Sequence, residues 1–70
     1  MPYATNDELP PAVRDHLPPH GQNIFREAFN QAFGRYYGDD AIAFRIAWAA
    51  VKRRYEKVGP VWAEKRASRL

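Results

Sequence analysis

The stretch AIAFRIAWAAVKRRYEK, from Ala41 to Lys57, decides the fold of this chain. Its first eleven residues are apolar except for Arg45, and four of the next six are basic. A helix that crosses a membrane needs about 20 predominantly apolar residues, so this apolar run is too short to span one. The stretch therefore predicts a buried helix whose last turns emerge into solvent.

This central helix is expected from about residue 40 to about residue 57. At 100° per residue, one face carries Phe44, Trp48, Val51 and Tyr55, with Ala47 beside them. The reverse side carries Ile42, Ile46 and Ala49. A helix that is apolar on two sides is covered by neighbours on several faces, so we expect the indole of Trp48 to be sealed in the core. The stem of Arg45 is expected to lie along apolar surface with its head in water, and an anion site is the alternative.

Prolines divide the part of the chain that precedes this helix. A proline fits the first turn of a helix and disfavours helix in the residue before it. LPPAVRDHLPP therefore predicts a short helix over about 10–16, which Pro18 stops. A second helix is expected over about 19–37, where YYGDD breaks it, and Asp39 or Asp40 then caps the central helix.

The second helix is amphipathic. Its apolar side chains recur with helical spacing on one face: Phe25, Ala28, Phe29, Ala32, Phe33 and Tyr36. A stripe of this kind indicates a face that packs into a hydrophobic core.

Two short segments outside the helices, PYAT at the start and PVWAE near the end, are compatible with strands. Paired with each other, they predict a two-stranded β-ribbon that joins the termini, with Tyr3 and Trp62 packing it against the helices. The predicted fold is thus mainly α, a compact three-helix domain over residues 1–70 with a small ribbon and a basic C-terminal segment over 61–70.

The residue content argues against an enzyme. The chain has no cysteine, which excludes disulfides, thiolate zinc sites and cysteine nucleophiles. His16 and His20 are separated by Pro18 and Pro19, so one helix cannot present both to a metal ion. Ser68 is the only serine, and YYGDD lacks the lysine of a phosphate loop. We therefore expect no catalytic site, no metal and no cofactor. MPYATNDELPP has no features of a signal peptide, and we expect a cytoplasmic location.

Positive charge is concentrated at the C-terminal end. Residues 1–51 hold four basic and six acidic residues, whereas residues 52–70 hold seven basic and two acidic ones. If Trp62 folds back beside the central helix, a basic surface would form from Lys52, Arg53, Lys57, Lys65, Arg66 and Arg69. Such a surface can bind nucleic-acid phosphates through charge alone, but it equally suits an acidic protein, an anionic membrane surface or plain solvation.

The segments MPYATNDELPPAVRDHLPPHGQNIFREAFNQAF and AWAAVKRRYEK resemble the ChaB family of small bacterial proteins named as cation transport regulators. The resemblance covers about residues 1–57 and includes Trp62. It implies three helices with a small sheet, related to the cyclin box, and an association with a sodium–calcium/proton antiporter. The loop GRYYGDDA is shorter than in many members, and Asp39 and Asp40 supply fewer oxygens than the 6–8 ligands that calcium takes.

These observations together predict a small, non-catalytic regulatory or adaptor protein that docks on a protein partner, which the resemblance suggests is the cytosolic face of an antiporter. The alternative is a small basic accessory protein that binds nucleic acid. A third possibility is a stable module whose role depends on a neighbouring gene or a fused domain.

Overall fold

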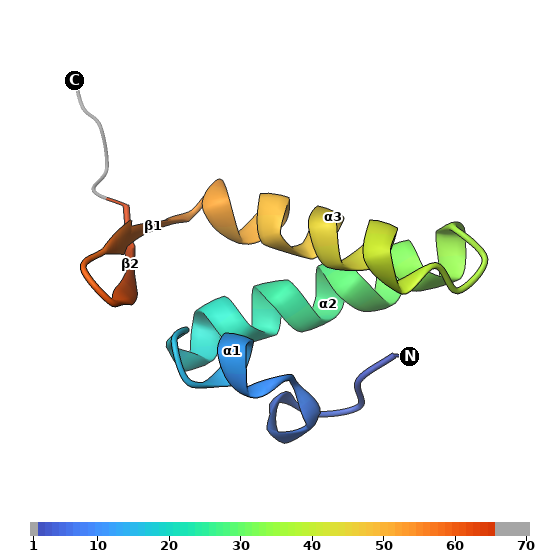
Figure 1. Ribbon diagram of the computed structural model, residues 1–70, viewed down its shortest axis with the longest axis horizontal. Coiled ribbons are helices and arrows are strands. Elements are labelled where there is room, and N and C mark those ends of the chain that lie inside the picture. Colours follow the sequence, from blue (N-terminus) through green and yellow to red (C-terminus); the bar gives the residue numbers. More distant parts are fainter. Residues whose placement is uncertain (1, 66–70) are drawn as a thin grey trace.

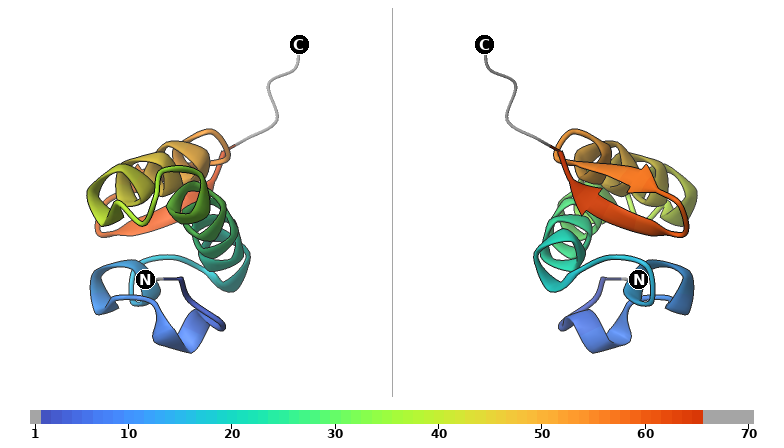
Figure 2. Two further views of the ribbon diagram at one scale, coloured as in Figure 1. Left: turned by 90° about the vertical axis from the view of Figure 1, so that its right-hand side faces the viewer. Right: turned by 90° about the vertical axis from the view of Figure 1, so that its left-hand side faces the viewer.

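Two antiparallel helices, α2 (Pro19–Arg35) and α3 (Asp40–Lys52), form the body of the domain (Figure 1). The computed structural model describes residues 2–65. A 3-10 turn, η1 (Asn6–Glu8), and the short helix α1 (Pro11–Arg14) lie against α2, as Figure 2 shows from both ends of the molecule. The strands β1 (Tyr55–Val58) and β2 (Val61–Glu64) form an antiparallel hairpin next to the end of α3. Three helices with a two-stranded sheet are the fold class that the sequence predicts.

The core lies where α1, α2, α3 and the first residue of β1 meet. Its buried residues are Leu9, Val13, Leu17, Phe25, Phe29, Ala32, Ala43, Ala47, Val51 and Tyr55. The predicted stripe on α2 is confirmed at Phe25 and Phe29, whereas Tyr36 at its end is 39% exposed. The stripe therefore leaves the core at the last turn of α2.

The faces of α3 differ from the prediction. Its buried residues are small, namely Ala43, Ala47 and Val51. Because these side chains are short, α3 can lie close to the phenylalanines of α2, and the larger side chains Phe44 and Trp48 lie on the flank, only partly buried. Ala49 and Arg45 are exposed, so α3 is covered on one side and not all round. The expectation that Trp48 is sealed in the core is wrong.

The end of the central helix was also predicted wrongly. Helix α3 ends at Lys52, Arg53 and Arg54 form a turn, and Tyr55–Val58 form β1 instead of further helical turns. Gly59, at φ 62°, and Pro60 make the two-residue turn to β2, and the register pairs Lys57 with Trp62. Since residues close in sequence lose little entropy on pairing, this local hairpin replaces the predicted ribbon between the termini.

The N-terminal segment PYAT is held by a side chain and not by a strand. The Tyr3 N–H donates to Asn30 Oδ1 at 2.9 Å, and Asn30 Nδ2 donates to the Tyr3 carbonyl at 2.8 Å. This amide from α2 satisfies both backbone groups of Tyr3, so Tyr3 needs no strand partner. The ring of Tyr3 packs on Phe29 with centroids 4.9 Å apart.

The remaining helix ends follow from local geometry. Helix α1 stops at Arg14 instead of residue 16, where the backbone turns toward Pro18. Helix α2 stops at Arg35 instead of 37, because Tyr37 (φ 58°) and the following glycine adopt left-handed backbone that a helix cannot continue. Of the two predicted caps, Asp39 is the one used, since its side chain accepts from the Ile42 N–H at 3.0 Å. Within residues 2–65, none of the helices combines the length and apolar character that crossing a membrane requires.

Candidate docking surface

A pocket of about 430 Å³ lies where α1, α3 and the hairpin meet. We call it the tryptophan–lysine pocket, and it is lined by Ala12, His16, Trp48, Lys52, Lys57 and Trp62. Its walls thus come from four elements and from the turn after α1. The pocket exists because the hairpin folds back over the end of α3.

The two indoles form an apolar wall. The rings of Trp48 and Trp62 lie with centroids 5.3 Å apart and planes tilted by 34°. Trp48 also contacts the buried Phe25 ring in a T-shaped arrangement, with centroids 5.3 Å apart. Both indoles are partly buried, so they are anchored in the fold and still present aromatic surface to the pocket.

The two lysines form the cationic rim of this pocket. Lys52 is the last residue of α3, and Lys57 stands opposite Trp62 in the register of the hairpin, on the same face of the sheet. Both are exposed. Among residues 2–65 the structure records no ion pair or hydrogen bond for either ammonium group. Their positive charges are therefore available to an anionic ligand.

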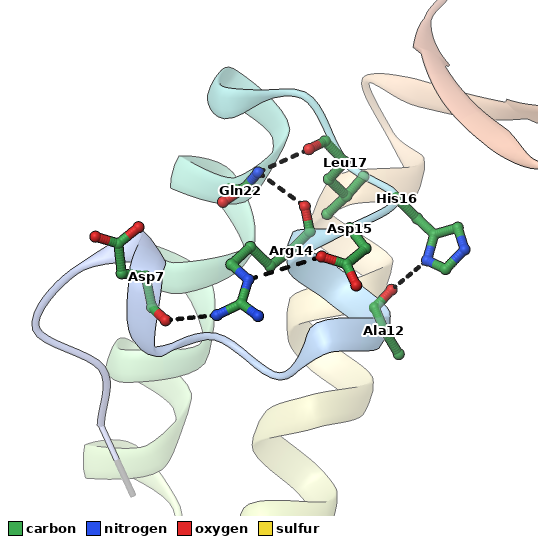
Figure 3. Close-up of polar contacts among 7 residues, drawn as sticks. All are labelled: Asp7, Ala12, Arg14, Asp15, His16, Leu17 and Gln22. Atoms are coloured by element: carbon green, nitrogen blue, oxygen red, sulfur yellow. Dashed lines mark hydrogen bonds and ion pairs between the residues drawn. The ribbon is translucent and has the colours of Figure 1, made fainter.

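The corner between α1 and α2 is fixed by polar contacts (Figure 3). Gln22 Nε2 donates to the carbonyls of Arg14 at 3.1 Å and Leu17 at 2.8 Å. Arg14 Nη1 in turn donates to the Asp7 carbonyl at 2.8 Å, which ties η1 to α1. One glutamine thus satisfies carbonyl groups on both sides of the turn and holds this corner in place.

The same corner positions His16 beside the pocket. His16 Nδ1–H donates to the Ala12 carbonyl at 3.0 Å, which leaves Nε2 as the ring nitrogen with no recorded partner in the described part of the chain (Figure 3). The His16 carbonyl accepts from the Trp62 N–H at 3.3 Å. This backbone hydrogen bond joins the hairpin to the turn after α1 and so helps to close the pocket.

Arg53 and Lys65, the other described residues of the predicted basic surface, do not line this pocket. Arg53 lines a groove of about 550 Å³ between α2 and α3, together with Arg35. Arg54, which was not part of the predicted set, pairs with Glu64 at 3.4 Å between Nε and Oε2. Lys65 is exposed, and its N–H donates to the Arg54 carbonyl at 2.9 Å. Arg66 and Arg69 lie outside the described residues. Of the six predicted residues, the structure therefore brings Lys52 and Lys57 together and places Arg53 at a different groove.

Metal-ligating residues do not gather in the part of the chain that the structure describes. Within residues 2–65, there is no group of three or more histidine, aspartate or glutamate side chains that could hold a metal ion. Asp39 uses its carboxylate to cap α3. The expectation that the chain binds no metal stays a prediction.

Tyr3 lies away from the pocket and has a perturbed pKa. Burial against α2 raises the pKa of its phenol above the ordinary value of 10.0, because the phenolate would lose solvation there. The negative charge of Asp40 adds to this effect on the pKa by opposing a second negative charge nearby. The raised pKa of Tyr3 thus reflects its packing in the fold and does not mark the candidate site.

Sequence reasoning assigned both tryptophans to the core and left Ala12 and His16 out of the site. A signal for the first tryptophan was available, since Trp48 and Lys52 are four residues apart and therefore share a helix face. Lys57 and Trp62 stand symmetrically about the turn at Gly59 and Pro60, which would have paired them had the hairpin been predicted. Ala12 and His16 could not be placed without the tertiary structure.

Comparisons with known proteins give the class to which this fold belongs. The ChaB family model matches residues 9–65. A protein of Escherichia coli strain K12 named "Putative cation transport regulator ChaB" is 46% identical over 66 residues, which cover 81% of this chain and 87% of that protein. A protein of Shigella flexneri with the same name has the same identity and coverage. A solution NMR structure, also titled as this regulator, has a TM-score of 0.81 and 41% identity and covers 93% of this chain and 100% of its own.

The fold and these matches define a small helical domain of the cation transport regulator type. The chain belongs to the ChaB family. The suggested relation to the cyclin box stays a prediction.

Proposed function

We propose that this chain regulates cation transport by docking on a protein, the cytosolic face of a cation/proton antiporter. Membership of the ChaB family supports a regulatory role, because its relatives are named for that role. A cytoplasmic location is part of the proposal, as is the absence of catalysis.

The tryptophan–lysine pocket is the observation that carries the proposal. Protein interfaces are enriched in tryptophan, and the residues that dominate binding are large side chains anchored in the fold. Trp48 and Trp62 have this character, since both are partly buried and contact each other. The charges of Lys52 and Lys57 beside them favour an acidic partner surface and would speed association with it.

Binding to nucleic acid is the competing proposal. A protein that grips a phosphate backbone through charge alone needs several cationic contacts, and its affinity falls steeply with salt. The described residues bring two lysines together at the pocket, and the acidic side chains of Glu56 and Glu64 lie on the same hairpin. We therefore favour a protein partner, for which two charges beside an aromatic wall are sufficient.

Co-purification from membranes tests the docking proposal. A tagged chain is added to membranes that contain the antiporter, and the retained antiporter is quantified for the wild type and for the double variant Lys52→Glu, Lys57→Glu. Arg45→Glu is the control for a single replacement, because it reverses one charge at an exposed position on α3 away from the pocket, which is half of the charge change in the double variant. We expect retention by the wild type and the control and loss in the double variant.

Two results would contradict the proposal. Failure of the wild type to retain the antiporter would remove docking on this partner. Equal losses in the double variant and in Arg45→Glu would show that net charge matters and the pocket does not. A gel shift with single-stranded DNA, run at two salt concentrations on the same samples, decides the nucleic-acid alternative.

A further inference from the structure

We infer that the tryptophan–lysine pocket recognises one short element of its partner, an apolar side chain flanked by carboxylates in an acidic linear segment. This inference rests on the proposed docking function and specifies what the pocket would read. Nothing in the family's name assigns such a ligand.

The size of the pocket limits its occupant. Its volume of about 430 Å³ is near the lower end of the range of about 300–1,000 Å³ that ligand sites occupy. A site of this size accepts a few side chains and not a whole helix. A short linear segment therefore fits it better than a folded surface.

The chemistry of the walls gives the composition of that segment. Partly buried indoles favour an apolar side chain, which would displace water from them. Lys52 and Lys57 reach the pocket from two different elements, α3 and β1, so carboxylates on both sides of that apolar residue can each meet an ammonium group. In an extended segment, residues two apart point to the same side, so carboxylates two positions before and after the apolar residue would face the lysines together with it.

The geometry of the indoles argues against a nucleobase as the occupant. Trp48 and Trp62 already lie at ring-contact distance, 5.3 Å between centroids, so no third ring can stack between them. A single-strand binder instead offers separate aromatic faces to successive bases along a basic groove. The contact between the two indoles leaves a wall suited to an aliphatic or aromatic side chain from a peptide.

The chain provides its own probe for this ligand. It contains two tryptophans, and both line the pocket, so intrinsic fluorescence reports directly on occupancy. The full chain would be titrated with an N-acetylated, C-amidated peptide of sequence Glu-Glu-Leu-Glu-Glu. The control peptides are Gln-Gln-Leu-Gln-Gln, which lacks the charges, and Glu-Glu-Ser-Glu-Glu, which lacks the apolar side chain. Calorimetry gives the affinity independently.

We expect saturable binding of the first peptide and at least tenfold weaker binding of each control peptide. Lys52→Gln and Lys57→Gln should each weaken binding about two- to fivefold, the range for an exposed charge pair. Arg45→Gln, exposed and outside the pocket, should leave the affinity unchanged. Circular dichroism confirms that each variant is folded, and the peptide controls need no variant at all.

The inference is overturned if the acidic peptide produces no fluorescence change and no heat, or if both control peptides bind as well as it does. Tighter binding of a single-stranded oligonucleotide at the same pocket would also overturn it. These outcomes are separable from the docking function. Charge-dependent retention of the antiporter without peptide binding would refute only this ligand, whereas peptide binding without retention would refute only the antiporter as partner.

Discussion

Replacing Phe25 with alanine should destabilise the domain more than replacing the larger Trp48. Phe25 is 0% exposed, and its ring touches Phe29, Phe44 and Trp48 at centroid distances between 5.3 and 6.2 Å. Truncating a buried phenylalanine to alanine costs about 3–5 kcal/mol, since it removes transfer energy and leaves a closed cavity. A chain of this length has a free energy of unfolding of about 4–10 kcal/mol, so Phe25→Ala loses most of it.

Trp48→Ala should cost less, although an indole is larger. A fully buried indole covers about 200 Å², worth about 5 kcal/mol at 25 cal/mol per Å². Trp48 is partly buried at the edge of a pocket, so truncation widens an open hollow that water can enter. We expect a loss of about 2–3 kcal/mol in the free energy of unfolding.

Urea denaturation followed by far-ultraviolet circular dichroism measures both changes without relying on the tryptophans. Phe25→Leu, which keeps an apolar side chain in the site, should cost about 1–2 kcal/mol and gives a measurable transition if the alanine variant does not fold. A larger decrease in the free energy of unfolding for Trp48→Ala than for Phe25→Ala would refute the reasoning. It would show that the indole is a centre of the core and not part of its edge.

Three further predictions concern the backbone and the N-terminal segment. Gly34→Ala should raise stability by about 0.5–1 kcal/mol, because Gly34 lies in α2 and nothing is within 4 Å of the added Cβ. Gly59→Ala should lower stability by about 1–2 kcal/mol, because Gly59 has a φ of 62° that a residue with a Cβ rarely adopts. Thermal melts compare the two variants. Asp39→Ala should cost about 1 kcal/mol through the lost cap on α3 and lower the melting temperature by about 4–8 °C. The folded state holds the proton of Tyr3 more tightly than the unfolded chain does. The protonated phenol therefore contributes fully to the stability of the fold below pH 10.0, and this contribution is lost as pH rises through the raised pKa. Urea unfolding at pH 8 and above pH 10 measures the free energy of unfolding at each pH. The decrease between the two pH values should be larger for the wild type than for Tyr3→Phe, and equal decreases would contradict the raised pKa of Tyr3.

The helices were predictable because their signals are local. Prolines mark where α1 and α2 begin, and the phenylalanine spacing identifies the inner face of α2. The segment RRYEK gave no such signal, since its residues suit a helix as well as a strand. Its strand form depends on distant contacts. The ring of Tyr55 packs beside Gly21, where an added Cβ would lie 3.5 Å from Tyr55 Cζ, and Trp62 bonds to the backbone of His16.

The candidate site was only half predictable for the same reason. On the helix that the sequence predicts through residue 57, Lys52 and Arg53 point about 100° apart and so face different directions, which was visible in the sequence. The meeting of Lys57 with Trp62 required the register of the hairpin, which the sequence reasoning had not predicted. A single basic surface that also includes Arg66 and Arg69 therefore stays a prediction.

The hydrogen bond between Trp62 and His16 has a consequence for the order of assembly. The helix pair α2–α3 and the hairpin each form from segments that are neighbours along the chain, whereas this bond unites an early turn with a late strand and must wait for both. We therefore expect the hairpin to dock late and to detach early. Deuterium should enter the amide of Trp62 through such partial detachment, sooner than it enters the amides of Phe25 and Phe29 in the middle of α2.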